Sequence, residues 1–156
     1  MPKATFAAGC FWAVEAGFQQ LPGVLATAVG YEGGTLSNPT YHDVCTDSTG
    51  HAEAVEIDFD PAQITYEQLL EAFFSLHDPT QLNRQGPDWG TQYRSAIFYH
   101  SPEQKTAAEA FIARLTQEKR FSKPIVTQVV PAEAFWRAED YHQKCLEKRG
   151  MLSCHI

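Results

Sequence analysis

The sequence has little basic charge, no long hydrophobic run and no internal repeat. Its 12 Lys and Arg are outnumbered by 19 Asp and Glu, for a net charge of −7, and they form no stripe that could neutralise successive phosphates. No window approaches the roughly 18 apolar residues of a membrane-spanning helix, and residues 1–8 are too short and polar for the core of a secretion signal. We therefore expect a cytoplasmic protein that binds neither nucleic acid nor membrane.

Cysteine is also scarce, with four residues among 156, and no Cys-x-x-Cys pair occurs. In a chain with no secretion signal, so few cysteines indicate reduced, catalytic or metal-binding thiols rather than a disulfide framework. The missing pair argues against a thioredoxin-like oxidoreductase. A zinc set is the other alternative, but its ligand spacing is imperfect, so we expect no metal and no bound cofactor. Its members would be His142, Cys145, Cys154 and His155.

What the chain does contain is the composition of one folded domain. Apolar residues make up 44% of the sequence, aromatic residues 12% and charged residues 20%, within 17.4 kDa. These values suit a single core. We expect one domain over residues 1–156, with a free C-terminal tail from about residue 150.

The hydrophobic pattern predicts an alternation of strands and helices. Val55, Ile57 and Phe59 alternate with acidic residues, as in a half-buried strand, and Thr65 with Gln68 forms a capping-box pattern ahead of a helix. Predicted strands cover about 3–8, 24–31, 55–59, 93–99 and 125–130, and predicted helices about 10–22, 65–77, 101–119 and 134–149. This order predicts an α/β (α+β) fold with a ferredoxin-like split βαβ core, in which helices pack on a mixed or antiparallel sheet. The irregular stretches 32–52 and 78–92 are expected to form long active-site loops at one edge.

Cys10 is the cysteine whose surroundings point most clearly to chemistry. It lies between a strand and a helix, and a helix N-terminus lowers the pKa of a thiol because unpaired N–H groups favour the anion. Gly9 removes bulk before the sulfur, while Phe11 and Trp12 could form an apolar wall beside it. The residues alone leave open a second interpretation, in which Cys10 is a small buried side chain at a strand end.

Seven short motifs, in order and in spacing, resemble the A-type peptide-methionine sulfoxide reductases over nearly the whole chain. This family repairs methionine sulfoxide. One departure is Ala13, where the family commonly has Gly. The motifs are Gly9-Cys10-Phe11-Trp12, Gly30-Tyr31 with Gly33-Gly34, Asn38-Pro39-Thr40-Tyr41, Gly50-His51-Ala52-Glu53-Ala54-Val55, His77-Asp78-Pro79, Gly90-Thr91-Gln92-Tyr93-Arg94-Ser95 and Tyr141-His142-Gln143.

The resemblance implies reduction of methionine S-sulfoxide, free or in proteins, without a cofactor. Such a reaction needs one thiolate and proton donors near the sulfoxide oxygen. The resemblance gives roles to Cys10 as nucleophile, Glu53 as the acid, Tyr41 and Tyr93 as hydroxyls that hold the oxygen, Asp88 as a group that orders the site, and Phe11 and Trp12 as the pocket for the substrate methyl.

Each role has a plainer alternative. Without the family, Glu53 would be a solvated carboxylate at the start of a strand, and Tyr41 and Tyr93 would be surface aromatics. Asp88 could be a turn residue beside a proline. His51 either positions the Glu53 segment or is a hydrogen-bonded loop histidine.

The remaining cysteines are candidates for the step after oxygen transfer, when Cys10 would carry a sulfenic acid that a second thiol condenses to a disulfide. Cys154 matches the family's C-terminal resolving position. Cys145 stands where the family usually has an aromatic residue, and is either helix core or a relay thiol. Cys45 lies in a predicted loop and could in principle form a disulfide with Cys10, but we expect it to be an inert structural thiol. The family further implies that thioredoxin, or another dithiol, reduces the disulfide, and we expect a monomer.

Overall fold

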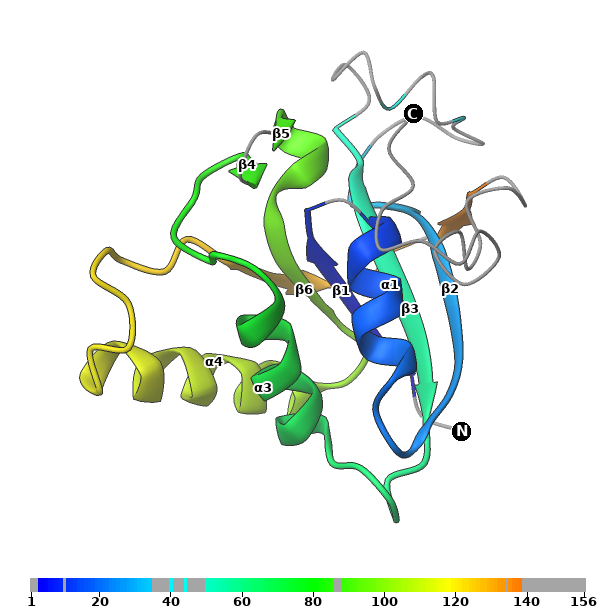
Figure 1. Ribbon diagram of the computed structural model, residues 1–156, viewed down its shortest axis with the longest axis horizontal. Coiled ribbons are helices and arrows are strands. Elements are labelled where there is room, and N and C mark those ends of the chain that lie inside the picture. The colour runs from blue at the N-terminus through cyan, green and yellow to red at the C-terminus, as the bar shows by residue number, and fades with distance from the viewer. Residues whose placement is uncertain are drawn as a thin grey trace.

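The structure is a computed structural model that describes residues 3–9, 11–34, 40, 44, 50–85, 88–133 and 135–138. Its elements alternate along the chain as the hydrophobic pattern predicts (Figure 1). They are β1 (Lys3–Ala8), α1 (Phe11–Gln19), β2 (Val24–Glu32), β3 (Ala52–Phe59), α3 (Tyr66–Leu76), β4 (Arg84–Gln85), β5 (Asp88–Trp89), the 3-10 helix η1 (Thr91–Tyr93), β6 (Ser95–Tyr99), α4 (Pro102–Gln117), β7 (Gln128–Pro131) and β8 (Trp136–Arg137).

Six strands form one sheet in the order β7-β6-β1-β3-β2-β8, and β4 pairs with β5 in a separate ribbon. Neighbouring strands of the large sheet run antiparallel, except that β6 and β7 are parallel. The strand β3 lies between β1 and β2, so the β1-α1-β2 unit is split, as in a ferredoxin-like fold. The predicted fold class is therefore confirmed.

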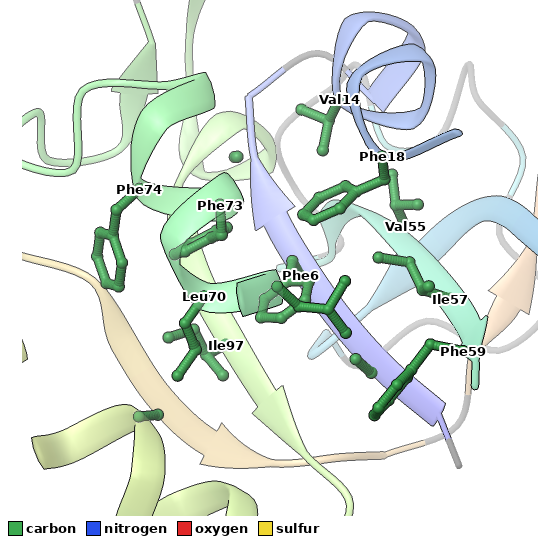
Figure 2. Close-up of a cluster of buried hydrophobic side chains, with 14 of the residues drawn as sticks. Phe6, Val14, Phe18, Val55, Ile57, Phe59, Leu70, Phe73, Phe74 and Ile97 are labelled. Carbon is green, nitrogen blue, oxygen red and sulfur yellow. The ribbon is translucent and has the colours of Figure 1, made fainter. Parts of the chain in front are cut away.

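Aromatic side chains fill the layer between the sheet and its helices (Figure 2). The Phe6 ring of β1 stacks on Phe18 of α1, with centroids 5.3 Å apart, and on Phe73 of α3 at 5.0 Å. Phe74 of α3 stacks in turn on Phe111 of α4 at 5.6 Å. One aromatic core thus joins three helices to the same face of the sheet, which fixes the start of α1 relative to the strand ends.

Two predicted helix starts are present as side-chain caps. Thr65 accepts a hydrogen bond from the Gln68 N–H at 3.1 Å, and the Gln68 side chain accepts one from the Thr65 N–H at 2.9 Å, which completes the capping box. Ser101 caps α4 by accepting from the Gln104 N–H. The Gln104 side chain instead accepts from the N–H of His100, one residue before the cap.

Several boundaries differ from the sequence prediction: α1 ends at Gln19 rather than near residue 22, and β3 begins at Ala52 rather than at residue 55. Strand β6 begins at Ser95 rather than at residue 93, because Thr91–Tyr93 form η1, and β7 begins at Gln128 rather than at residue 125. Trp136 and Arg137 form β8, so the helix predicted from 134 is wrong at these two residues. Residues 139–149 of that helix lie outside the described part of the chain.

A close approach to Gly30 explains why β8 is a strand. A Cβ at Gly30 would collide with the Trp136 carbonyl oxygen and would lie 2.7 Å from the Phe135 ring. The missing side chain lets segment 135–137 pair with β2, with Gly30 opposite Arg137 and Tyr31 opposite Trp136. Among the described residues, no helix is both long enough and apolar enough to cross a bilayer.

Candidate active site

Segments that carry Glu53 and Tyr93 meet at one edge of the sheet, the edge formed by the end of β1 and the starts of β3 and β6. Strand β1 runs antiparallel to both β3 and β6, so the end of β1 that leads to Gly9 lies beside the starts of those two strands. Ala8 is the cross-strand partner of Ser95, and Tyr31 is the partner of Glu53. The ribbon β4-β5 lies near the same edge, above the start of β6 in Figure 1. The long-range pairing therefore brings together segments that the sequence analysis placed in separate motifs.

Helix α1 begins at Phe11, immediately after Cys10 in the chain. The prediction that Cys10 adjoins a helix N-terminus agrees with this boundary. Cys10 itself lies outside the described residues, and so do the side chains of Phe11 and Trp12, whose backbones form the first turn. Their proposed roles as nucleophile and methyl pocket remain predictions.

Glu53 is a buried carboxyl on the helix-bearing face of the sheet. Residues 53, 55, 57 and 59 of β3 point the same way because strand side chains alternate, and Val55, Ile57 and Phe59 belong to the aromatic core. Only 1% of Glu53 is exposed. The Gln92 amide donates to Glu53 Oε2 at 3.4 Å. The interpretation of Glu53 as a solvated carboxylate is therefore wrong, and its burial suits a placed proton donor.

Gln92 was missed by the sequence analysis as a functional residue, although it lies in a quoted motif. It is 4% exposed and precedes Tyr93, the last residue of η1. Because η1 runs directly into β6, the turn holds Gln92 and Tyr93 at the same sheet edge as Glu53. The structure thus brings together Glu53 and the segment of Tyr93, which is partly buried.

Asp88 lies in β5, with its backbone opposite Gln85 of β4. Its side chain is outside the described part of the structure, and so are Tyr41, Cys45, Cys145 and Cys154.

His51 ties two segments of this edge together. It is 2% exposed, and its Nδ1 accepts a hydrogen bond from the Gly34 N–H at 3.0 Å. The contact joins the turn after β2 to the residue that precedes β3. This contact agrees with both interpretations left open by the sequence, so the role of His51 remains a prediction.

His77 is a partly buried histidine that follows the C-terminal end of α3. Its Nδ1 lies 2.7 Å from the Phe73 carbonyl oxygen and its Nε2 lies 2.7 Å from Ser95 Oγ. Burial lowers the pKa of His77 to about 4, against the opposing effects of the Phe73 carbonyl and Asp78. The ring is therefore neutral at pH 7, with the proton on Nδ1, because a carbonyl can only accept, and with Nε2 accepting from Ser95. Ser95 Oγ lies in turn 2.7 Å from Thr127 Oγ1.

Glu32 is a buried carboxyl that the sequence analysis did not single out. Its position in β2 alternates with Tyr31, so it faces away from Glu53. The Glu133 N–H donates to its Oε2 at 3.0 Å, while Oε1 has no hydrogen-bond partner among the described residues. Burial raises the pKa of Glu32 to about 7, although the Glu133 N–H opposes the shift. A carboxyl that titrates near neutrality therefore lies on the opposite face of the sheet.

The described ranges contain no group of three or more His, Cys, Asp or Glu side chains that could hold a metal ion. The alternative zinc set of His142, Cys145, Cys154 and His155 lies outside those ranges.

The sheet topology defines a ferredoxin-like α/β protein, and the buried Glu53 carboxyl lies at the start of β3, beside the end of β1. A model of the peptide methionine sulfoxide reductase family matches residues 2–156. The peptide methionine sulfoxide reductase MsrA of Acidobacterium capsulatum is 76% identical over 156 residues, which are all of both chains. The chain therefore belongs to the peptide methionine sulfoxide reductase family, and it is an oxidoreductase.

Solved structures agree with this assignment. Methionine sulfoxide reductase A of Corynebacterium diphtheriae has a TM-score of 0.91 at 38% identity, over 97% of this chain and 76% of that chain. Mxr1 from Saccharomyces cerevisiae in reduced form has a TM-score of 0.90 at 34% identity, over 96% and 86% of the two chains. Mxr1 is also known in complex with Trx2, with a TM-score of 0.66 at 24% identity, over 90% and 83%.

Proposed function

We propose that this chain reduces methionine S-sulfoxide, free or in proteins, with Cys10 as nucleophile and Glu53 as proton donor. The observation that carries the proposal is the burial of Glu53, at 1% exposure, on the face and edge of the sheet where β1 leads to Cys10 and α1 begins. A sulfoxide sulfur becomes a good electrophile only when its oxygen is protonated or strongly hydrogen-bonded. A carboxyl held close to a thiolate meets that need.

In this scheme the Cys10 thiolate attacks the sulfoxide sulfur while Glu53 donates a proton to its oxygen, which Tyr41 and Tyr93 hold. Asp88 orders these groups, and Phe11 and Trp12 surround the substrate methyl. The oxygen passes to Cys10 as a sulfenic acid and methionine leaves. The thiol is oxidised by two electrons and the sulfoxide is reduced by two, so the step is balanced.

The second half of the cycle uses another thiol of the chain. Cys154 attacks the sulfenic sulfur, water leaves, and a Cys10–Cys154 disulfide forms; Cys145 is the second choice for this thiol. A thioredoxin dithiol then reduces the disulfide, as family membership and the complex of the yeast relative with Trx2 suggest. No cofactor takes part.

The cellular setting is part of the same proposal. The domain of residues 1–156 acts as a cytoplasmic monomer that repairs proteins after oxidative stress, and its C-terminal tail from about residue 150 brings Cys154 to the site. A reducing cytoplasm keeps the four cysteines available as thiols.

The test is the thiol status of the reduced protein after one equivalent of methionine S-sulfoxide, read by intact mass and peptide mapping, with the R epimer as control. The expected result is methionine together with a Cys10–Cys154 disulfide for the S epimer only. A Cys10→Ser variant should form no methionine. Unchanged thiols in the wild type, or sulfoxide reduction by the Cys10→Ser variant, would refute the proposal.

A further inference from the structure

Both residues that precede Cys10 are in contact with side chains anchored at the end of α3. Ala8 is the cross-strand partner of Ser95, which is hydrogen-bonded to His77. Gly9 packs against Gln85, which is hydrogen-bonded to Asp78. His77 and Asp78, which follow α3, are thus linked to the two residues before Cys10. His77 is linked to Ala8 through Ser95, and Asp78 is linked to Gly9 through Gln85.

The Gln85 side chain is held at its amide end by a pair of backbone hydrogen bonds. The Asp78 N–H donates to Gln85 Oε1 at 2.9 Å, and Gln85 Nε2 donates to the Asp78 carbonyl oxygen, also at 2.9 Å. Because the amide oxygen and the amide nitrogen of Gln85 both bond the backbone of Asp78, the side chain is restricted to one orientation. Its aliphatic stem is therefore fixed in place.

That stem lies directly against the backbone of Gly9. A Cβ on Gly9 would be 2.8 Å from Gln85 Cγ and 2.9 Å from Gln85 Cβ, so the contact leaves no room for a side chain. Gly9 also has a φ of 95°, in a region that glycine populates about as readily as the region of negative φ. A glycine therefore has many conformations open to it at this position. The Gln85 stem beside it limits the conformations that are open to Gly9.

His77 and Asp78, which follow α3, are themselves held by hydrogen bonds. Asp78 Oδ1 accepts from the Thr80 N–H at 3.0 Å and from Thr80 Oγ1 at 2.6 Å. His77 is bonded to both Phe73 and Ser95. Movement of Gln85 would therefore require movement of the turn at Asp78, which the adjoining His77 ties to β6 through Ser95.

We propose that Gln85 is a positioning residue for the Cys10 thiol: it transmits the position of the α3 end to Gly9, and so holds Cys10 at the N-terminus of α1. Its effect on the reaction rests on the proposed function, whereas its effect on the thiol does not. A thiolate displaced from the helix N-terminus loses the N–H groups that favour it. Displacement of a reacting atom by about 1 Å can cost on the order of 100-fold in rate.

The test compares Gln85→Met with Gln104→Met. The methionine keeps an aliphatic stem but loses both amide hydrogen bonds. Gln104 is a matched control, because its amide also bonds two backbone groups: it accepts from the His100 N–H at 2.9 Å and donates to the Lys3 carbonyl at 2.8 Å. Lys3 is at the opposite end of β1 from Gly9. Both changes remove similar contacts, and only one of them adjoins the nucleophile.

Two quantities are measured: the pH dependence of Cys10 alkylation by iodoacetamide, resolved by peptide mapping, and the single-turnover rate of methionine formation. For Gln85→Met we expect the midpoint of alkylation to rise by about half a pH unit or more and the single-turnover rate to fall about tenfold or more. Gln104→Met should leave both near the wild-type values. Gln85→Ala serves as the second variant where methionine does not fit.

A shift in both quantities supports the proposal, and a Gln85 variant that keeps the wild-type alkylation profile overturns it, whatever its rate. So does an equal shift in Gln104→Met, which would reflect general loss of stability. Failure of the wild type to form methionine would refute the proposed function instead, and the alkylation comparison would then decide the role of Gln85 by itself.

Discussion

Glu53 takes its position from the alternation of a strand. Because Val55 and Ile57 face the helices, Glu53 is carried to the same face two residues earlier, at the point where the core meets the sheet edge. Gln92 reaches it from η1, a turn distant in sequence. A carboxyl in this place is shielded from water while it stays close to the segment that leads to Cys10.

Glu53→Gln should lower the single-turnover rate of sulfoxide reduction about 10²- to 10⁴-fold, because the amide can donate a hydrogen bond but cannot deliver a proton to the leaving oxygen. Iodoacetamide alkylation of Cys10 provides the control, since it needs no proton donor and should change little. A Glu53→Gln variant that turns over at the wild-type rate would contradict the assignment.

Gln92→Leu should lower the same rate about fivefold, the equivalent of one lost hydrogen bond of about 1 kcal/mol. The reason is that the amide helps to orient the Glu53 carboxyl. Introduced into Glu53→Gln, the change should have no further effect, because the group it orients is already inactive. Additive losses in the double variant would show that Gln92 acts elsewhere.

Glu32 predicts a pH dependence of stability. Its pKa is about 7 in the folded chain and about 4.5 in the unfolded chain, so between these values the folded state binds more protons. The free energy of unfolding should therefore fall as the pH rises from 4.5 to 7, by about 2 kcal/mol from this group. Glu32→Gln should remove that fall in denaturant titrations at pH 5 and pH 8. An unchanged pH dependence in the variant would contradict the prediction.

At the scale of elements, the end of α3 is joined to β6 through His77 and Ser95. The pKa of His77 is about 4 when folded and 6.5 when unfolded, so the unfolded chain binds more protons in this interval. Acidification from pH 6.5 to pH 4 should therefore lower the free energy of unfolding, opposite in sign to the effect of Glu32.

His77→Gln should accordingly make the protein relatively more resistant to acid, although less stable at pH 7, where it loses a fitted ring. Chemical denaturation at pH 7 and pH 4.5 measures the difference, and its contribution is about 2 kcal/mol. Glu32→Gln is the informative comparison, since it should steepen the loss of stability on acidification that His77→Gln flattens. The same slope in both variants would contradict the two assignments.

The elements that could be predicted from the sequence are those encoded by neighbours in the chain. The alternation of Val55, Ile57 and Phe59 and the capping box of Thr65 are local signals, and both were confirmed. The strand at 136–137 was not predictable, because it depends on the missing Cβ of Gly30, a hundred residues away. Helical propensity was overridden there by a tertiary contact.

The candidate site likewise combines features that local sequence predicts with contacts that it does not predict. The burial of Glu53 follows from the local strand pattern once the helices are in place, whereas the Gln92–Glu53 and Gln85–Asp78 contacts join segments whose proximity no local pattern encodes. The roles of Cys10, Tyr41, Asp88 and the resolving cysteines came from the family resemblance and remain predictions.

For the molecule as a whole, the proposed cycle requires the C-terminal segment to reach the edge that carries Glu53. Strand β8 pairs with the end of β2, where Trp136 lies opposite Tyr31, the cross-strand partner of Glu53, and from there the chain runs back along β2 to Ala138, which donates to the Val29 carbonyl. The residues that contain Cys145 and Cys154 lie beyond the described part of the chain, so the approach of Cys154 to Cys10 remains a prediction.

Cys154→Ser should keep a single turnover of methionine S-sulfoxide but lose most thioredoxin-coupled turnover, because the sulfenic acid on Cys10 would have no resolving partner. The burst of methionine and the steady-state rate are measured on the same sample, with Cys45→Ser as control. Full steady-state activity in Cys154→Ser would transfer the resolving role to Cys145 or Cys45.

Strand β2 has one further irregularity, a bulge that leaves Leu25 out of register between Val24 and Ala26. Leu25 is 51% exposed, on the part of β2 that precedes its pairing with β8. A regular hydrophobic edge would offer a template for strands of other molecules, and a bulge interrupts that template. The bulge therefore makes this stretch of β2 a poorer site for the addition of a strand from another molecule.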